Sequence, residues 1–418
     1  MEGLEIPSYF LCPISLEMMR DPVTLPTGIT YDRQSIERWL FDLKRSTCPV
    51  TKLPLSADAA VCTPNHTLRR LIQAWCTLHS SDGVERIPTP KPPVGQDEVA
   101  ALLEASARVP TQLDALRKLR RISGESERNR RCVAGTPGAV DALARVVVLS
   151  ASSDLETIDR DYAVLTSSST ACDEALAVLH SLQISEDALL DLVVRNADLV
   201  GSLTSVLQRS NYQSRSYAML ILKSVLAVVS PGRLMALPQE LFDEVVGVIR
   251  DGVSPQATRA ALRVLAGACP WGRNRAKAAK AGAVHAAVEL LLEDPERRAC
   301  EAALAALASV CGCAEGRAEL VRHRAAVAVV SKKILRVSQL ASEKAVRVLH
   351  ELARHGPTTA LLQEMVQAGA VTKLFVVVQA GGGGKMEERA REILRMHARA
   401  WRDSPCLSFL FKNGVSTL

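Results

Sequence analysis

Aromatic residues, paired cysteines and long apolar runs are what this sequence has least of. Aromatic residues make up 4% of the 418 residues, although 48% of all residues are hydrophobic. Leu, Val and Ala must therefore supply most of the packing, and this mixture favours many closely packed helices over a β-sandwich. A chain of this length also exceeds one ordinary hydrophobic core, so we expect two or more units.

The cysteine pattern argues against a disulfide framework. Eleven cysteines are scattered along the chain, and none forms a CxxC pair. An odd, dispersed set is typical of reduced, mostly buried thiols in a cytosolic protein. We therefore expect a cytoplasmic protein, with a nuclear fraction allowed.

Neither a membrane nor a nucleic acid is an expected partner. The most apolar stretch, residues 218–229, contains Lys223 and is shorter than the roughly 20 residues that cross a bilayer. Residues 1–5 are acidic and lack the basic and apolar regions of a signal peptide. The net charge of +6 is mild, and the basic residues within 117–131 are interrupted by acidic ones, which favours a solvated helix face.

The first predicted unit, residues 6–80, is built around two cysteines. Cys12 and Cys48 each begin a pair with CxxC spacing, but Ser15 and Thr51 stand where the second thiols would be. The layout resembles a RING zinc finger, which needs eight Cys or His ligands for two zinc ions. Two thiolates cannot replace that set, so we expect no metal and no other cofactor. Hydrogen bonds, ion pairs and a small apolar core must hold the domain, with contributions expected from Asp21, Asp32, Arg33 and Ser35.

Residue periodicity predicts two helices in this unit, after segments of β character at 23–24 and 29–31. The first helix covers 33–43, with Asp32 as its N-cap because a short carboxylate accepts hydrogen bonds from first-turn N–H groups. The second covers about 67–78. Each has one apolar face at helical spacing, formed by Ile36, Trp39, Leu40 and Leu43 in the first and by Leu68, Leu71, Ile72 and Trp75 in the second.

The rest of the chain is predicted to be a linker and a helical solenoid. Residues 81–97 contain four prolines and two glycines, so this linker should be extended and fairly stiff. From 98 to 407, apolar doublets recur, and those from 200 to 371 lie 42, 42, 43 and 44 residues apart. This period is typical of armadillo and HEAT repeats. The first step, of 60 residues, predicts an inserted loop at about 150–170, and the glycines at 381–384 predict a second loop.

Four blocks of sequence, residues 6–24, 30–33, 36–40 and 63–72, resemble the U-box of plant E3 ubiquitin ligases. The similarity continues into the linker and, more weakly, into the repeats. The most similar group is the plant U-box proteins with armadillo repeats, which includes stress- and elicitor-responsive members. The resemblance implies a mainly α protein, in which a small α+β, zinc-free, RING-like U-box is followed by an all-α armadillo superhelix.

The resemblance also assigns roles to particular residues. A ubiquitin-conjugating enzyme (E2) would bind in a groove, and an apolar patch with a polar rim is physically a binding site. The alternative, that Ile14 and Trp39 only pack the domain, is outweighed by four positions matching in register. Lys52 stands where many such ligases have an arginine, and it offers one point charge in place of a guanidinium fork. The groove positions are Ile14, Leu16, Trp39 and Pro49, and the supporting positions are Cys12, Val23, Asp32 and Cys48.

The implied function is that of an E3 ubiquitin-protein ligase without a covalent intermediate. The U-box would hold the ubiquitin-charged E2, the repeats would hold a protein substrate, and the chain would also ubiquitinate itself. Its contribution would be proximity and orientation. A non-catalytic armadillo adaptor or scaffold is the alternative, although Trp271 and Trp401 do not recur in repeat register as in import-type adaptors. A U-box homodimer is left open.

Two further features of the repeats are a histidine pair and a Pro/Gly-containing segment. His350 and His355 are five residues apart on a helix, a spacing that does not make a metal pair, so we expect solvated or capping roles. The segment 269–275 is similar to a short signature of the plant group, and its Pro and Gly mark a turn between helices. Partner contact and turn geometry both remain open as its role.

Overall fold

The structure is a computed structural model of the whole chain. It describes residues 6–43, 45–55, 62–85, 87, 94–153, 170–182, 184–381, 384–402 and 407. The chain divides into two compact units, Met1–Val99 with Arg121–Val133 and Ala100–Arg120 with Ala134–Leu418. The U-box lies in the first unit and most of the helical repeats lie in the second.

The U-box is a small three-stranded sheet flanked by short helical segments. Strands β1 (Pro22–Thr24), β2 (Thr30–Asp32) and β3 (Thr63–Pro64) form an antiparallel sheet in the order β2-β1-β3. The β1–β2 turn contains Gly28, whose φ of +83° favours glycine. The sequence predicted the first two strands but not β3, which has only two residues. The helical segments are η1 (Ser8–Phe10), α1 (Arg33–Glu37), η2 (Arg38–Asp42), α2 (His66–Leu78) and η4 (Ser80–Asp82).

One apolar core holds this domain together. Strand and helix residues meet in this core, and Val23, a predicted supporting residue, is fully buried in it. The fully or nearly fully buried members are Phe10, Cys12, Met19, Val23, Leu25, Tyr31, Ile36, Leu40, Cys48, Ile72 and Cys76.

The first predicted helix forms, but its second half is a π-helix. In η2 the N–H of Leu43 donates to the carbonyl oxygen of Arg38, a bond to the fifth preceding residue. This wider turn rotates the following residue off the apolar face. Leu43, predicted to be buried on that face, is therefore 55% exposed.

Two other local predictions were wrong. Asp32 is the N-cap residue of α1, but its side chain makes no capping bond. Its carboxylate instead accepts bonds from the backbone N–H groups of Arg20 and Asp21. In α2, Leu71 was predicted to lie on the apolar face, but it is 53% exposed. The buried face instead runs through Ile72 and Cys76, which are four residues apart and both buried.

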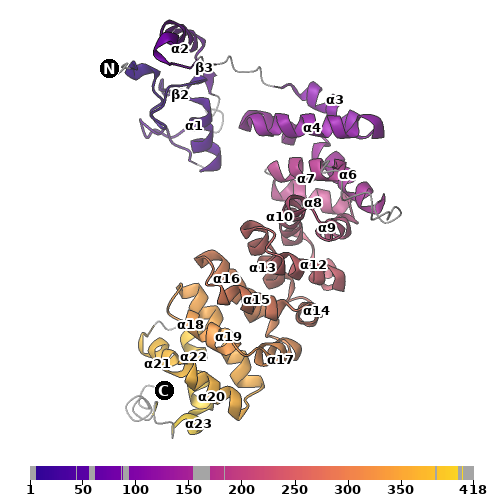
Figure 1. The fold of residues 1–418 in the computed structure, drawn as a ribbon, viewed down its shortest axis with the longest axis vertical. Coiled ribbons are helices and arrows are strands. Elements are labelled where there is room, and N and C mark those ends of the chain that lie inside the picture. The colour runs from indigo at the N-terminus through magenta and orange to yellow at the C-terminus, as the bar shows by residue number, and fades with distance from the viewer. Residues whose placement is uncertain are drawn as a thin grey trace. The chain divides into compact units, whose positions relative to one another are not determined.

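The solenoid is a succession of helices, shown in order along the chain in Figure 1. From α8 onward each repeat has a first helix, a second helix that contains the predicted apolar doublet, and a third helix. The third helices α10, α13, α16, α19 and α22 pack against one another in sequence. The bounds are α3 (Gln96–Ser106), α4 (Val109–Glu125), α5 (Glu127–Gly135), α6 (Ala139–Ser153), α7 (Ala171–Ser181), α8 (Glu186–Arg195), α9 (Leu199–Leu207), α10 (Tyr212–Val228), α11 (Pro231–Met235), α12 (Gln239–Arg250), α13 (Pro255–Ala268), α14 (Asn274–Lys280), α15 (Ala283–Leu292), α16 (Arg297–Val310), α17 (Ala314–Arg322), α18 (Ala326–Lys333), α19 (Gln339–His355), α20 (Thr359–Gln367), α21 (Ala370–Gln379), α22 (Lys385–Met396) and α23 (Ala398–Arg402).

Glycine opens the second helix of two repeats. Gly282 and Gly369 adopt φ values of +86° and +69° directly before α15 and α21. A side chain is strained in this left-handed region, so glycine allows the sharp turn from the preceding helix. The recurring apolar doublet that follows each glycine is buried, as the repeat pattern predicted.

Polar side chains also tie neighbouring repeats together. His350 is 7% exposed, and its Nε2 lies 2.8 Å from the Glu392 carboxylate of the next repeat. The predicted solvated or capping role of His350 was therefore wrong, because it is a buried bridge between α19 and α22. Asn274 is fully buried and donates to the carbonyl oxygens of Leu234 and Ala268, which favours turn geometry as the role of segment 269–275.

Several predicted loops fall wholly or partly outside the described residues. These are residues 86 and 88–93 of the linker 81–97, residues 154–169 of the predicted insertion at 150–170, and half of the glycine run at 381–384. The described helix α3 begins at Gln96, within the predicted linker. Within the described residues, no single helix is both long and apolar enough to cross a bilayer, and two bent helix pairs meet those criteria only jointly.

Candidate functional site in the U-box

Two loops of the U-box repeat one backbone design. In the first loop, the N–H of Leu16 donates to the Cys12 carbonyl oxygen and the N–H of Cys12 donates to that of Glu17, both at 2.8 Å. In the second loop, the N–H of Lys52 donates to the Cys48 carbonyl oxygen and the N–H of Cys48 donates to that of Leu53, both at 2.9 Å. Leu16 and Lys52 both adopt a left-handed backbone, with φ of +59° and +60°. We call residues 12–17 the Cys12 loop and residues 48–53 the Cys48 loop.

The sulfur of Cys48 is surrounded by hydroxyl groups. The Tyr31 hydroxyl lies 3.1 Å from it, and the Thr27 hydroxyl donates to it at 3.3 Å. Burial raises the pKa of the Cys48 thiol, but bonds from Thr27, Thr51 and Tyr31 lower it by more, to about 6. The thiolate is therefore the favoured form at neutral pH, held by hydroxyl donors. Burial and the neighbouring thiolate also raise the pKa of Tyr31, so its hydroxyl stays protonated as a donor.

The sulfur of Cys12 is held mainly by backbone. It accepts a bond from the N–H of Asp32 at 3.3 Å. Burial raises the pKa of this thiol, and bonds from the backbone of Ser15, Asp32 and Ile14 lower it below its usual value. Because Tyr31 and Asp32 are consecutive in β2, the two sulfurs are fixed by adjacent residues of one strand.

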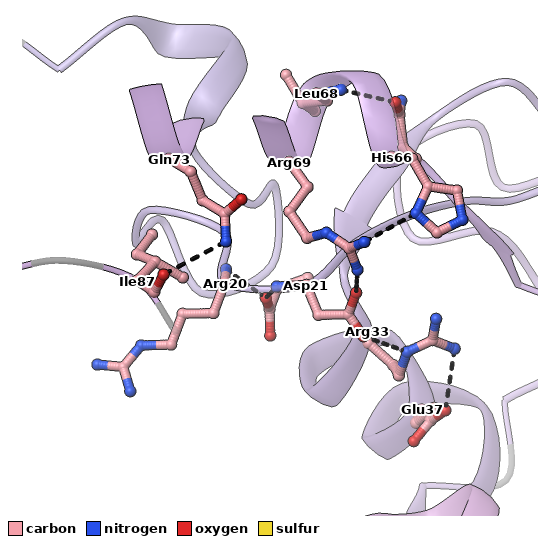
Figure 2. Close-up of polar contacts among 11 residues, drawn as sticks. Arg20, Asp21, Arg33, Glu37, His66, Leu68, Arg69, Gln73 and Ile87 are labelled. Carbon is pink, nitrogen blue, oxygen red and sulfur yellow. Dashed lines mark hydrogen bonds and ion pairs between the residues drawn. The ribbon is translucent and has the colours of Figure 1, made fainter. Parts of the chain in front are cut away.

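A second polar cluster joins the strands to both helices (Figure 2). The carboxylate of Asp21 lies 2.5 Å from Arg33 Nε and 3.7 Å from Arg69 Nη1. Arg33 also lies 3.8 Å from Glu37, whose carboxyl pKa is raised by burial and lowered less by Arg33. Asp21, Asp32 and Arg33 thus act in the predicted metal-replacing bonds, whereas Ser35 lies outside this cluster.

The predicted groove residues differ in exposure. Leu16 is 74% exposed, although it is a large apolar side chain. Ile14 and Trp39 are half-buried against the core, and Pro49 is also half-buried. The Trp39 indole N–H donates to the Thr47 carbonyl oxygen at 2.8 Å, which fixes the ring beside the entrance to the Cys48 loop. These side chains therefore lie on, or next to, the two rigid loops.

The structure adds surface residues that the sequence reasoning missed. Val50 and Leu53 of the Cys48 loop are 51% and 56% exposed. Arg45 and Lys52 each place their charge 6.0 Å from the centre of the Trp39 ring. The sequence contained a signal for Val50, because Val50 follows Cys48 by two residues just as the predicted groove residue Ile14 follows Cys12.

The residues around the two sulfurs do not assemble a metal site. Ser15 and Thr51, at the second position of each pair, offer hydroxyls that hydrogen-bond to the cysteine sulfur. In the described part of the chain, no group of three His, Cys, Asp or Glu side chains with converging ligand atoms includes Cys12 or Cys48. The donor set of this domain suits hydrogen bonding and lacks the four ligands that a structural zinc ion requires.

Comparisons with known proteins agree with both halves of this architecture. The family model described as U-box domain matches residues 6–81, and the one described as plant U-box protein ARM repeat region matches residues 98–413. E3 ubiquitin-protein ligase PUB23 of Arabidopsis thaliana is 50% identical over 412 residues, covering 97% of this chain and 96% of that protein. E3 ubiquitin-protein ligase PUB22 of the same plant is 48% identical over 430 residues, with 97% of each chain covered.

A solved structure supports the fold of the repeats. It was reported for the interaction between cadherin and beta-catenin, shares 15% identity, and covers 79% of this chain and 59% of its own, with a TM-score of 0.58. A zinc-free RING-like domain followed by stacked three-helix repeats defines a U-box protein of the armadillo class. The chain belongs to the plant U-box proteins with an armadillo-repeat region. Its activity is that of an E3 ubiquitin ligase, a ubiquitin transferase that works with E2 enzymes and ubiquitin.

Proposed function

We propose that the Cys12 and Cys48 loops, together with Trp39, form the E2-docking surface. The single observation that supports this most is the exposure of large apolar side chains on backbone that is fixed at both loops. Leu16 and Val50 are 74% and 51% exposed, although burial is the usual place for such residues. Ile14, Trp39 and Pro49 would form the floor of this surface, because all three are half-buried and the first two pack against the core.

The proposed role in the reaction is positional. The thioester between ubiquitin and the E2 cysteine would be attacked directly by a substrate lysine, and no thiol of this chain would accept ubiquitin. The U-box would raise the rate by orientation and by restricting the bound ubiquitin. Lys52 would contact the E2–ubiquitin pair through one ammonium group, which gives weaker directional control than an arginine would.

The armadillo repeats are the proposed holder of a protein substrate. Stacked third helices present a continuous surface of side chains, which is how helical solenoids bind extended partners. Lysines of the chain itself are also proposed targets, so autoubiquitination is expected. The cytoplasm remains the proposed compartment, since seven of the ten described cysteines are buried thiols, and a U-box homodimer is a separate prediction that light scattering on the intact chain would test.

The test is autoubiquitination in vitro with E1, E2, ubiquitin and ATP, with a metal chelator present throughout. Ile14→Ala, Leu16→Ala and Trp39→Ala should each reduce the ubiquitin ladder strongly. Leu71→Ala is the matched control, because Leu71 is an apolar U-box side chain that is 53% exposed on α2, and it should leave the ladder unchanged.

The three variants separate docking from folding. Leu16 is so exposed that its truncation should not unfold the domain, whereas Trp39 also contributes to packing. A ladder that survives in Leu16→Ala and Ile14→Ala would contradict the proposed surface. The absence of a ladder from folded wild-type protein with several E2 enzymes would instead favour the adaptor alternative.

A further inference from the structure

Two histidines and a glutamate converge on the surface between consecutive armadillo repeats. His285 and Glu289 project from α15, and His323 follows the last residue of α17. One nitrogen of each histidine and one oxygen of Glu289 all lie within 4.8 Å of one another. Among the described residues, this is the single group of three or more His, Cys, Asp or Glu side chains that meets this criterion.

The local structure explains why the three side chains meet. His285 and Glu289 are four residues apart, so they lie on the same face of α15. His323 ends α17 in an extended conformation, with its backbone N–H bonded to the Leu320 carbonyl oxygen. Its ring Nε2 lies 2.8 Å from Glu289 Oε1, and its ring centre lies 5.1 Å from that of His285.

We propose that this cluster binds one zinc ion, or another divalent transition metal, through His285, Glu289 and His323. Two imidazole nitrogens and a carboxylate oxygen are a known protein ligand set for zinc, with water in the fourth position. The nitrogen ligands favour zinc over magnesium or calcium, which prefer oxygen. Because metal–ligand bonds are about 2.0–2.2 Å long, the three side chains must draw together around the ion, and two of them are exposed enough to move.

Metal binding requires a proton to move on His323. In the metal-free structure, Nδ1 accepts a bond from the Ala325 N–H at 3.3 Å, so Nε2 carries the proton and donates to Glu289. A metal at Nε2 takes that position, and the proton shifts to Nδ1 of the same neutral ring. The hydrogen bond from the Ala325 N–H to Nδ1 is lost in this step, and at 3.3 Å it is long and therefore weak.

The site would join two repeats. His285 and Glu289 belong to the second helix of one repeat, whereas His323 comes from the first helix of the next. A ligand that binds the folded array more strongly than the unfolded chain stabilises the folded state. Bound zinc should therefore raise the unfolding temperature of the repeats in proportion to the logarithm of its concentration.

The experiment measures zinc bound by the intact, tag-free chain at equilibrium, together with the visible spectrum of the cobalt form. His285→Ala, Glu289→Gln and His323→Ala should each weaken binding at this site at least tenfold, since even residues that only support metal ligands affect affinity by about 10–100-fold. The matched control is His355→Ala. His355 and Glu351 are also four apart on one helix, with 3.7 Å between Nε2 and Oε2, but that pair belongs to no third-ligand cluster among the described residues.

The outcomes are distinct. Loss of one zinc equivalent, and of a tetrahedral cobalt spectrum, in the three ligand variants but not in His355→Ala would establish the site. Equal zinc in all variants, or an equal loss in His355→Ala, would overturn the proposal. Circular dichroism of His285→Gln, in an exposed position, separates metal loss from unfolding, and none of these substitutions lies in the proposed E2-docking surface.

Discussion

The Cys12 and Cys48 loops have the same backbone and different chemistry. Both place a cysteine carbonyl and N–H in the same pair of bonds, and both have a left-handed residue at the fifth position. At that position the Cys12 loop presents an exposed leucine, and the Cys48 loop presents a lysine. The shared backbone supports the fold, and the differing tips are available to recognise different parts of a partner.

The two sulfurs also differ in what replaces the metal. Cys48 is held by the hydroxyls of Tyr31 and Thr27, whereas the hydrogen bond to Cys12 at 3.3 Å comes from the N–H of Asp32. One layout with two thiols is thus stabilised mainly by side-chain hydroxyls at Cys48 and mainly by backbone N–H groups at Cys12.

Removing the sulfurs should give the largest effect and should separate the two loops. Cys48→Ala leaves the fully buried Tyr31 hydroxyl without its acceptor, so we expect a loss of about 3 kcal/mol in local unfolding free energy. Cys12→Ala should lose about 2 kcal/mol, because backbone N–H groups, among them that of Asp32, lose their acceptor. Hydrogen–deuterium exchange of peptides covering β1 and β2 in the intact chain measures both.

Cys76→Ala is the matched control for that comparison. Cys76 is fully buried in the same core, its thiol donates to the Met18 sulfur at 3.7 Å, and burial raises its pKa. Its truncation therefore reports the loss of a buried thiol whose pKa is raised rather than lowered. Equal effects of all three substitutions would mean that the hydrogen bonds to Cys12 and Cys48 contribute nothing beyond packing.

Changing pH should sharpen the same difference. The pKa of Cys48 is about 6 in the folded protein, below that of an ordinary thiol, so its contribution to stability is complete above the unfolded pKa and disappears as pH falls through about 6. Between these values the U-box should gain up to about 1.4 kcal/mol per pH unit from this group. Exchange rates of the β1 and β2 amides, corrected for intrinsic pH dependence, would measure this gain in stability. Cys48→Ser should flatten the dependence of stability on pH.

Much of this site could be predicted from the sequence, because its positions follow an ordered motif. The missing thiols at Ser15 and Thr51 predicted a domain held without metal, and Asp21, Asp32 and Arg33 do form replacing bonds. The pairing could not be predicted. Asp32 has the residue type and position of an N-cap, but its carboxylate accepts bonds from the N–H groups of Arg20 and Asp21, which directly precede β1. A contact between residues so far apart in the sequence leaves no periodic pattern.

The repeats show the same division between what sequence can and cannot reveal. Their apolar doublets gave the period and the second helices, because burial repeats whenever the stack repeats. Long-range polar pairs do not repeat. His350 and Glu392 are 42 residues apart, and His323 and Glu289 are 34 apart, so neither pairing is visible until the helices are stacked. The i, i+4 spacing of His285 and Glu289 was the one local signal for the proposed metal cluster.

Exchanging the tip of the Cys48 loop should have a moderate effect on catalysis. Lys52→Arg should increase the discharge of ubiquitin from E2 several-fold, since a guanidinium offers several directed donors where an ammonium offers a point charge. The change should be in the maximal rate rather than in the ligase concentration needed for half of it. Single-turnover discharge onto free lysine measures both quantities. Arg45→Lys, also 6.0 Å from the Trp39 ring, is the comparison variant, and an unchanged rate for Lys52→Arg would argue against a role for this tip.

The smallest expected effect tests whether the two backbones are equivalent. Leu16 and Lys52 have nearly equal positive φ values, and this conformation costs an L-residue roughly 1–2 kcal/mol. Glycine removes that cost but adds about 0.5–1 kcal/mol of unfolded-chain entropy, so Leu16→Gly and Lys52→Gly should each stabilise the U-box by about 0.5–1 kcal/mol. Gly28→Ala, at φ +83° with open space around the added carbon, should change stability in the opposite direction. If glycine stabilised only one of the two loops, the two hydrogen-bonded backbones would not be equally strained. The side chain at the fifth position, and not the backbone, would then decide which residue each loop accepts at that position.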